Sequence, residues 1–329
     1  MFATYARKKR NMFTFLAMLL AFAVFVAGCG SQQTVSEKGG EETKKEEATR
    51  TVKHAMGETK VPEHPQKVVI LTNEGTEALL ALGVKPVGAV KSWTGTDEPF
   101  YKHIAKDMEG VTVVGDEHQP NLEKIAALKP DLILGNKMRQ EKIYQQLSAI
   151  APTVFSEELR GAWKDNFKLY AEALNKKAEG DKLLADWDKR IADFKQKAGD
   201  KLSTKVSVVR FMTGKTRIYY KDTFSGIILN EIGFARPAAQ DKDEFADEVT
   251  KERIPEMDGD ILFYFTYETG DGQASQAEKE WTNDPLWKNL SVVKKGQAHK
   301  VDDVIWNTAG GIKAANLMLD DLEKYFLKQ

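Results

Sequence analysis

The chain has 329 residues, enough for two domains of ordinary size, and 42% of them are apolar, which suffices for a sizeable core. Its 48 lysines and arginines nearly balance its 49 aspartates and glutamates. A chain without a basic excess is not expected to bind nucleic acid, and a single cysteine excludes an internal disulfide.

The N-terminus is predicted to be a targeting segment that spans residues 1–28. The basic stretch RKKR precedes an uninterrupted apolar stretch at 15–28, which falls short of the roughly 20 residues that a membrane-spanning helix needs. The stretch leads into VAGC, which resembles the lipobox of bacterial lipoproteins and predicts lipidation of Cys29. Residues 29–51 are polar and rich in Gly, Ser, Glu and Lys, so we expect a disordered tether, with folded structure beginning near Val52.

Short β-branched runs alternate with helical patterns in the next part of the chain, which we assign to an N-terminal lobe at 52–177. The predicted strands are VVIL, VKPVGAV, VTVVG, DLILG and PTVF, and the helical stretches between them include TEALLAL, NLEKIAALK and EKIYQQLSAI. Alternation of this kind predicts an α/β fold with mainly parallel strands.

A long helix is predicted to connect this lobe to a second one. In DKLLADWDKRIADFKQKAG, the apolar residues step by three or four positions: Leu184, Trp187, Ile191, Phe194 and Ala198. This spacing places one apolar stripe along a helix whose other faces are charged. We assign 178–200 to the connecting helix and 201–329 to a C-terminal α/β lobe, in which strand and helix patterns start afresh with KVSVVRF, RIYY, FSGIILNEIGF and DILFYF.

Two blocks of the first lobe recur in the second lobe in the same order. NLEKIAALKPDLIL aligns with TKERIPEMDGDILF, so that Ile125 corresponds to Ile254 and Asp131 to Asp260. Upstream of each block, LLALGVKP corresponds to ILNEIGFARP. Two matches in the same order predict that the two lobes are similar.

These stretches resemble the substrate-binding proteins of iron–siderophore ABC importers, in which one rigid helix bridges two lobes. The resemblance covers roughly 52–329 and rests on LLALGVKPVG, NLEKIAALKPDLIL, QLSAIAPTV, DTFSGIILNEIGFARP and VDDVIWNTAGGIKAANLMLDDL. It implies two Rossmann-like lobes with a ligand cleft between them, no enzymatic activity and no cofactor. The implied ligand is a ferric siderophore of the hydroxamate or citrate-hydroxamate type, which itself holds the iron.

The same resemblance implies the partners and the location of the protein. A monomer would be anchored through Cys29 to the outer face of the cytoplasmic membrane, in a Gram-positive bacterium, and would deliver its ligand to a permease dimer. Glu123 and Glu252 stand at equivalent points of the repeated block, and in this family a glutamate of each lobe at these positions docks the importer. From the residues alone, each is equally a carboxylate at a helix N-terminus, stabilised by the helix dipole.

Candidate ligand contacts follow from the chemistry of a ferric siderophore. Arg and Lys suit its oxygens, and aromatic rings suit its apolar rim. Such residues near strand ends or in loops are Lys91, Trp93, Arg139, Arg210, Arg217, Tyr219, Tyr220 and Trp306. Strand alternation places Tyr219 and Tyr220 on opposite faces, and the resemblance favours Tyr220 and, above all, Arg139. His118 is a further candidate in a strand-end loop.

Other ligands and an enzymatic function are alternatives to a ferric siderophore. Relatives with this architecture carry haem, cobalamin or bare metal ions. A bare-metal site is not expected, because no two of the histidines form a close pair in the sequence: His54, His64, His103, His118 and His299. Haem remains an alternative, since a Tyr or His could serve as its axial ligand. The chain has no GxxxxGK[ST], GxSxG, HExxH or GxGxxG motif that would indicate an enzyme, so a lipoprotein enzyme is the weaker alternative.

Overall fold

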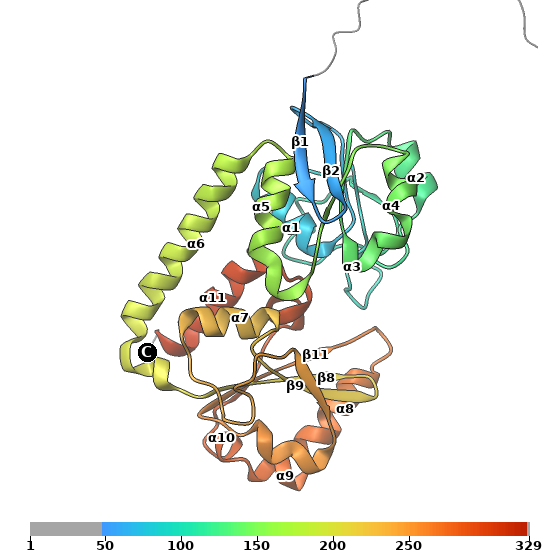
Figure 1. Cartoon of the computed structure of the whole chain (residues 1–329). Helices are drawn as coiled ribbons and strands as arrows, with labels where there is room; N and C mark the ends of the chain where they lie inside the picture. The colour runs from blue at the N-terminus through green and yellow to red at the C-terminus, as the bar shows by residue number, and fades with distance from the viewer. Residues whose placement is uncertain (1–47, 328–329) are drawn as a thin grey trace, which may run out of the picture. The chain divides into compact units, whose positions relative to one another are not determined.

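A computed structural model describes residues 48–327 (Figure 1). The predicted signal segment at 1–28, Cys29 and almost all of the predicted tether lie outside the described residues. Within residues 48–327, no helix is long and apolar enough to cross a membrane. The described residues therefore comprise the two predicted lobes and the helix between them.

The described chain starts with a hairpin that the sequence analysis did not predict. Strands β1 (Thr49–His54) and β2 (Gly57–Pro62) pair in an antiparallel register. Val52 and Val61 are buried and belong to the core of the N-terminal lobe. Each strand has only one fully buried position, so its apolar alternation is too sparse to identify it in the sequence. The first strand consequently begins upstream of Val52, where folded structure was expected.

The N-terminal lobe contains a parallel five-stranded sheet, which confirms the predicted α/β fold with mainly parallel strands. The strands lie in the order β5-β4-β3-β6-β7. Their bounds are β3 (Val68–Ile70), β4 (Gly88–Ala89), β5 (Thr112–Val113), β6 (Leu132–Asn136) and β7 (Thr153–Ser156). All residues of β3, β6 and β7 are buried, which explains why each strand contains an apolar run without polar alternation: VVI, LIL and VF.

Helices connect the parallel strands of this lobe. They are α1 (Asn73–Ala81), α2 (Leu122–Ala127), α3 (Lys137–Gln140), α4 (Tyr144–Ser148) and α5 (Trp163–Ala173), with the short 3-10 helices η1 (Glu141–Ile143) and η2 (Arg160–Ala162). Helix α1 begins directly after β3, where the Thr72 hydroxyl accepts the N–H group of Gly75 (3.0 Å). This cap fixes the start of α1 beside the carboxyl end of the sheet.

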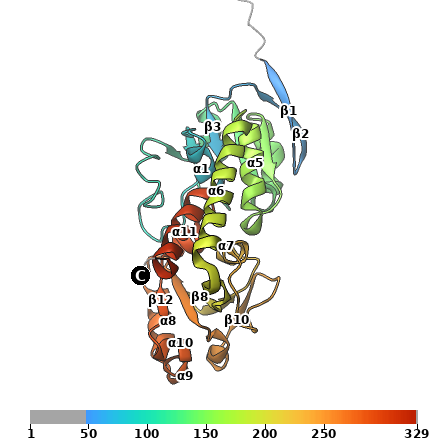
Figure 2. The same ribbon diagram turned by 90° about the vertical axis from the view of Figure 1, so that its left-hand side faces the viewer.

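The connecting helix α6 (Lys177–Ala198) is close to the predicted range of 178–200. All five residues of the predicted apolar stripe are buried, with at most 7% of their surface exposed: Leu184, Trp187, Ile191, Phe194 and Ala198. The helix ends at Gly199, whose φ of 51° lies in the region that favours glycine. Figure 2 shows α6 beside α5 and α11 (Ile312–Phe326).

The C-terminal lobe contains a second five-stranded sheet, in the order β10-β9-β8-β11-β12. Its strands are β8 (Val206–Met212), β9 (Lys215–Tyr219), β10 (Ala246–Val249), β11 (Ile261–Tyr267) and β12 (Ala298–Lys300). Strands β8, β11 and β12 are parallel, whereas β9 pairs antiparallel with β8, and β10 pairs antiparallel with β9. The second lobe thus differs from the first, because only two residues separate β8 from β9 and so short a connection allows only antiparallel pairing.

Helices of the C-terminal lobe complete the fold. They are η3 (Gly199–Ser203), α7 (Phe224–Ile232), η4 (Lys251–Met257), α8 (Gln273–Thr282), α9 (Pro285–Asn289), α10 (Ser291–Lys294) and the π-helix η5 (Val304–Thr308), which leads into α11. Helix α11 packs against α1 and α5 of the first lobe as well as against α6. The last helix of the chain therefore joins the two lobes.

The aspartate of the repeated block has the same structural role in both lobes. Asp131 accepts the N–H groups of Gln66 and Lys67 (2.8 and 3.0 Å), directly before β3. Asp260 accepts the N–H group of Lys205 (2.8 Å), directly before β8. In each lobe the carboxylate fixes the start of the middle strand of the sheet. This explains one position of the repeat without any reference to function.

Two other positions of the repeat also correspond in the structure. Ile125 and Ile254 are both fully buried. Glu123 lies in the first turn of α2 and Glu252 in the first turn of η4, and both side chains are exposed. The buried positions stabilise each lobe, whereas the glutamates lie at the surface.

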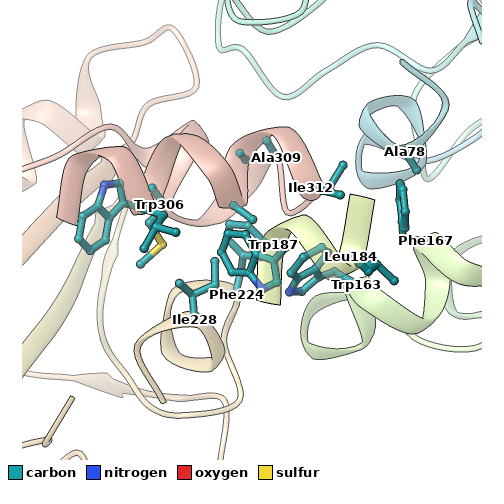
Figure 3. Close-up of a cluster of buried hydrophobic side chains, with 14 of the residues drawn as sticks. Ala78, Trp163, Phe167, Leu184, Trp187, Phe224, Ile228, Trp306, Ala309 and Ile312 are labelled. Carbon is teal, nitrogen blue, oxygen red and sulfur yellow. The ribbon is translucent and has the colours of Figure 1, made fainter. Parts of the chain in front are cut away.

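One continuous apolar core joins the lobes on the side of α6 and α11. Figure 3 shows side chains from both lobes and from the joining helices in this core, which include Ala78, Trp163, Phe167, Leu184, Trp187, Phe224, Ile228 and Ile312. The rings of Trp163 and Trp187 meet edge to face at 5.5 Å between centroids. The Trp187 Nε1–H group donates to the Glu231 carboxylate on α7 (3.2 Å). Helices from both lobes and α6 thus share one packed interface.

Candidate functional site

A cavity of about 510 Å³ lies between the two lobes, at the carboxyl ends of strands from both sheets. From the first lobe it is lined by Glu74, Trp93, Glu117, His118, Arg139 and Leu159. From the second lobe it is lined by Arg210, Met212, Thr213, Lys215, Arg217, Phe224, Phe245, Tyr267, Thr269 and the segment Asn307–Gly310. Four cationic side chains and several aromatic rings therefore converge on one cleft, which is where a ligand is expected in a fold of this class.

Four of the eight predicted contact residues line this cavity: Trp93, Arg139, Arg210 and Arg217. His118 lines it as well, and its ring packs against that of Trp93 with 5.4 Å between centroids. They are drawn from both lobes, so the structure brings together side chains that lie far apart in the sequence. Whether each one touches the ligand stays a prediction.

Arg210 is held on the wall of the cavity by a buried ion pair. Its Nε and Nη2 atoms donate to the two carboxylate oxygens of Asp303 (2.6 and 2.9 Å), its Nη1 to the Tyr219 hydroxyl (3.0 Å) and its Nη2 to Thr308 (2.7 Å). Burial alone would lower the pKa of Arg210, but its interactions with Tyr219 and Asp303 outweigh burial and raise the pKa. Most of its donors are thus already engaged within the protein, so Arg210 offers the ligand a fixed charge with little remaining hydrogen-bonding capacity.

Arg139 and Arg217 remain more accessible than Arg210. The side chain of Arg139 is 29% exposed, and its Nε lies 3.4 Å from the Glu117 carboxylate. The side chain of Arg217 is 23% exposed, and its Nη2 donates to Glu248 (2.6 Å). Their guanidinium groups can therefore exchange part of their present contacts for ligand oxygens.

The other four predicted contacts lie away from the cavity lining. Tyr219 and Tyr220 are fully buried, and they belong to different apolar clusters, which confirms the predicted opposite faces. The preference for Tyr220 is not supported, because its hydroxyl donates to Asp247 (2.7 Å) while Tyr219 is the one that contacts Arg210. The period of a strand separates two faces, but the helices and loops packed on each face decide which one meets the cleft.

Trp306 and Lys91 were also predicted to contact the ligand, but neither lines the cavity. Trp306 is fully buried, stacks near Phe263 at 4.5 Å between ring centroids and donates its Nε1–H group to Asp321 (3.2 Å). It lies in η5 and packs into the core, because the loop expected before the last helix is itself a helical turn. The Lys91 ammonium group donates to the Thr96 carbonyl (3.3 Å) in its own loop.

The sequence analysis missed two buried carboxyl groups of the cavity, Glu74 and Glu117. Glu117 accepts the N–H and Nδ2 groups of Asn73 (2.7 and 2.8 Å). Burial raises the pKa of Glu74 to about 8, and this rise is opposed by a hydrogen bond from Asn166 and strengthened by Glu117 and Glu77. Both residues follow strand ends, but the chemistry of a ferric siderophore pointed to basic and aromatic side chains there and not to carboxyl groups.

Two loops close the cavity on the side away from the core, where they meet through glycine. A Cβ atom added to Gly95 would lie 2.2 Å from the Glu268 carbonyl oxygen, and one added to Gly270 would lie 2.3 Å from the Gly95 carbonyl oxygen. Both glycines have positive φ angles, 65° and 94°. The loops of the two lobes are thus in backbone contact beside Trp93 and Thr269, which line the cavity.

Among residues 48–327, no cluster of three or more His, Cys, Asp or Glu side chains is arranged to hold a metal ion. The histidines that line or approach the cleft have other contacts. His103 pairs with the buried Glu77 beside α1, and His118 packs on Trp93.

The chain is similar to known binding proteins over most of its length. A family model described as periplasmic binding protein matches residues 68–304. The chain is 54% identical to the "Probable siderophore-binding lipoprotein YfiY" of Bacillus subtilis (strain 168), over 97% of this chain and 99% of that protein. It is 31% identical to the "Fe(3+)-citrate-binding protein YfmC" of the same organism, over 98% of each. The solved structure of Staphylococcus aureus SirA complexed with staphyloferrin B has a TM-score of 0.77 and 39% identity, and covers 85% of this chain and 100% of that chain.

Proposed function

The chain belongs to the periplasmic binding protein family, and we propose that its ligand is an anionic ferric complex of a citrate-containing siderophore, the citrate-hydroxamate type included. Its role within the family is that of a substrate-binding protein for ferric siderophore uptake. The observation that carries the proposed ligand class is the basic wall of the cavity, to which both lobes contribute: Arg139, Arg210, Lys215 and Arg217.

The charge balance of the cavity favours an anionic ligand over a neutral one. Among the side chains that the structure describes, four cationic ones line it against two carboxyl groups, and one of these, Glu74, has a pKa of about 8 and is mostly neutral at pH 7. A ferric complex with three hydroxamates carries no net charge, whereas each free carboxylate of a citrate unit adds a negative one. Arginine suits such carboxylates, because its planar fork of donors matches two oxygens at once.

The remaining wall of the cavity suits the apolar part of such a complex. Trp93, Phe245 and Tyr267 present aromatic surface beside the basic groups. In this proposal the siderophore oxygens hold the iron, and the protein recognises the outside of the complex. Arg139 and Arg217 bind the carboxylates, while Arg210 contributes a charge that Asp303 keeps in place.

The ligand class is tested by titrating the full chain with a panel of complexes and following the fluorescence of its six tryptophans, of which Trp93 lines the cavity. The panel contains ferric citrate, a ferric citrate-hydroxamate, a neutral ferric trihydroxamate, a ferric tricatecholate and haem. We expect the citrate-containing complexes to bind most tightly. Tighter binding of the neutral trihydroxamate, or a response to haem alone, would refute the proposed ligand class.

A matched pair of variants tests the basic wall. Arg139→Gln removes a charge that lines the cavity, whereas Lys137→Gln removes one from the same helix that pairs with Glu157 and does not line the cavity. A hydrogen bond to a charged group is worth about 1.5–3 kcal/mol, so Arg139→Gln should weaken binding roughly ten- to hundredfold. Lys137→Gln is expected to bind like the wild type. Equal losses in both variants would place the ligand elsewhere.

We further propose that Glu123 and Glu252 dock the protein onto a permease dimer. Both are exposed, one in each lobe. Hydrogen bonding to Thr250 and to a backbone N–H group lowers the pKa of Glu252, which keeps it ionised. The Glu123→Ala, Glu252→Ala double variant should bind ligand normally but support much less iron uptake by cells. A control pair, Glu109→Ala with Glu280→Ala, removes an exposed carboxylate from each lobe and should leave uptake unchanged. Normal uptake by the first pair at equal abundance would exclude the docking role.

The membrane anchor is proposed to be Cys29. The motif VAGC and the naming of a 54% identical Bacillus relative as a lipoprotein support this, and they favour anchoring at the outer face of the cytoplasmic membrane of a Gram-positive bacterium. Cys29→Ala should release the protein into the soluble fraction without changing its ligand affinity. A variant that still sediments with washed membranes would contradict the anchor.

A further inference from the structure

Three carboxyl groups are buried side by side at the start of α1 and in the loop that follows β5. Glu74, Glu77 and Glu117 are each at most 7% exposed. Glu74 and Glu117 line the cavity, whereas Glu77 does not. Three carboxylates cannot all stay ionised so close together unless each has compensating donors or cations. The partners of each carboxyl group therefore indicate which of them is neutral.

Two of the three carboxyl groups have the partners that an ionised group needs. Glu117 accepts two hydrogen bonds from Asn73, one of them from its backbone N–H group, and lies beside the Arg139 guanidinium. Glu77 pairs with the His103 imidazole and accepts the N–H group of Ala314, at the start of α11 (2.9 Å). Each thus has a basic side chain and a backbone donor.

Glu74 is different from its two neighbours. Among the described residues, its one hydrogen-bond partner is the neutral side-chain amide of Asn166 on α5, with Nδ2 2.8 Å from Oε1. No ion pair joins it to a Lys, Arg or His among the side chains that the structure describes. Burial, aided by the charges of Glu117 and Glu77, raises its pKa to about 8 in spite of the Asn166 contact. Its geometry and its surroundings both favour the protonated form.

We propose that Glu74 is a specificity-determining residue, a neutral carboxylic acid in the cavity wall that donates a hydrogen bond to an anionic oxygen of the ligand. This inference rests on the proposed anionic ligand. An ionised carboxylate at this place would repel such a ligand, whereas the protonated acid offers it a donor. Glu74 thereby selects anionic complexes in a way that the arginines alone do not, because a donor of fixed position requires an acceptor opposite to it.

The charged and titratable side chains that the structure describes around Glu74 come from several packed elements. They are Glu77 on its own helix, Tyr170 on α5, Glu117 and His118 in the loop after β5, Arg139 on α3, His103 and Tyr101 beside α1, and Arg210 with Asp303 in the second lobe. The carboxylates among them favour the protonated state of Glu74. The arginines are engaged by Glu117 and Asp303, so their charges are offset locally.

The proposal gives a definite sign for the effect of pH on binding. Below pH 8 the acid already holds its proton, so ligand binding does not change its state. Above pH 8 the free protein has lost this proton, and binding must return one proton from the solvent to the Glu74 carboxylate. Affinity therefore falls as pH rises through about 8, roughly tenfold between pH 7 and pH 9, and binding at pH 9 takes up close to one proton per ligand.

Calorimetric titration of the full chain with ferric citrate and with a ferric citrate-hydroxamate tests this. Titrations at pH 7 and pH 9, in buffers of different ionisation enthalpy, give both the affinity ratio and the proton uptake. Glu74→Gln keeps an amide donor and cannot ionise. For the same ligand, its affinity should therefore be equal at pH 7 and pH 9, whereas that of the wild type should fall. Glu74→Leu lacks the donor and should bind more weakly than Glu74→Gln at both pH values. Glu98→Gln, a change at an exposed carboxylate outside the cavity, should keep the wild-type ratio.

A measurement without ligand separates this inference from the proposed ligand class. Infrared spectra of the ligand-free wild type at pH 7 should show the carbonyl band of a buried carboxylic acid, and this band should be absent from Glu74→Gln. If the band is absent from the wild type, or unchanged in Glu74→Gln, the proposal is overturned whatever the ligand is. It is also overturned if wild type and Glu74→Gln lose affinity in parallel between pH 7 and pH 9. If no citrate-containing complex binds although the band is present, the ligand class is wrong and so is the hydrogen bond to its anionic oxygen.

Discussion

The two lobes meet at two places that are built in opposite ways. Beside α6 and α11, large side chains from both lobes interlock in one apolar core, with Trp163 and Trp187 near its middle. On the other side of the cavity, two loops touch through the backbone of Gly95 and Gly270, with no side chains between them. The core residue Phe224 and the loop residues Trp93 and Thr269 line the cavity, so the cavity lies between a packed contact and a thin one.

This difference indicates where the molecule can move. Close packing resists displacement, because every shift opens voids or forces side chains out of their rotamers. A contact between two glycine loops buries little area and separates at low cost. Any opening that admits the ligand is therefore expected to part the loops, with the core of α6 and α11 as the pivot.

The largest effect is expected from breaking the packed contact. Trp187→Ala removes a side chain that is 1% exposed and also leaves Glu231 without its indole donor. It should lower the free energy of unfolding by about 3–5 kcal/mol, as measured by urea denaturation. Leu286→Ala, at a residue that is 40% exposed, is the control and should cost far less. Similar losses in the two variants would show that the core is not what joins the lobes.

A smaller loss of stability is expected from the polar contact beside the cavity. Arg210→Ala leaves Asp303 buried and without its ion-pair partner, in the segment that leads to α11. The free energy of unfolding should fall by about 3 kcal/mol at pH 7. The double variant Arg210→Met, Asp303→Asn removes both charges and should recover much of this loss in the same urea assay. No recovery would mean that the guanidinium contributes mainly through its contact with Tyr219 and Thr308.

Adding a methyl group at the loop contact should affect ligand release more than stability. Gly95→Ala places a Cβ against the Glu268 carbonyl oxygen and has to push the loops apart, at a cost of about 1–3 kcal/mol. Ligand dissociation, followed by stopped-flow tryptophan fluorescence, should become faster. Gly272→Ala, in the second-lobe loop that Gly95 contacts, is a matched control, since its φ is also positive at 74° but no atom lies within 4 Å of the added Cβ. Equal dissociation rates in both variants would show that the loop contact does not retain the ligand.

The double variant sharpens this test. Gly95→Ala and Gly270→Ala each separate the same two loops. Once the loops are apart, the second methyl group meets less obstruction, so the combined change in dissociation rate should be smaller than the product of the single changes. Fully multiplicative effects would mean that the two glycines act independently.

The smallest effect is expected from the carboxylate that shapes the second-lobe loop. Glu268 accepts the N–H groups of Thr269, Gly272 and Ser275. Hydrogen bonds lower the pKa of Glu268 to about 2, and those from Ser275 have the largest effect. Glu268→Gln should cost at most about 1 kcal/mol, because solvent screens this exposed group. The contribution of a depressed carboxyl is present above its unfolded pKa and is lost as pH falls through about 2. The stability difference between wild type and variant should therefore shrink between pH 6 and pH 3, and a constant difference would contradict it.

Local patterns in the sequence were sufficient to predict most of the fold. The stripe of α6 is buried as its spacing predicts, and the N-terminal sheet is parallel as its alternation predicts. The hairpin of β1 and β2 was missed, because one fully buried residue in each strand leaves no period to detect. The RIYY strand was predicted, but its antiparallel direction as β9 was not, since a run of residues carries no mark of strand direction, and β10 was not predicted at all.

The sequence by itself determined the family resemblance, the two lobes, the helix between them and the strand ends at which a site had to lie. Only the tertiary structure decided which side chains meet in the cavity. It separated Tyr219, which supports Arg210, from Tyr220 on the opposite face, and it placed the acidic Glu74 among the basic residues. The physical reason is that periodicity arises within a few residues of chain, whereas the face that becomes a cavity depends on helices and loops contributed from more than a hundred positions away.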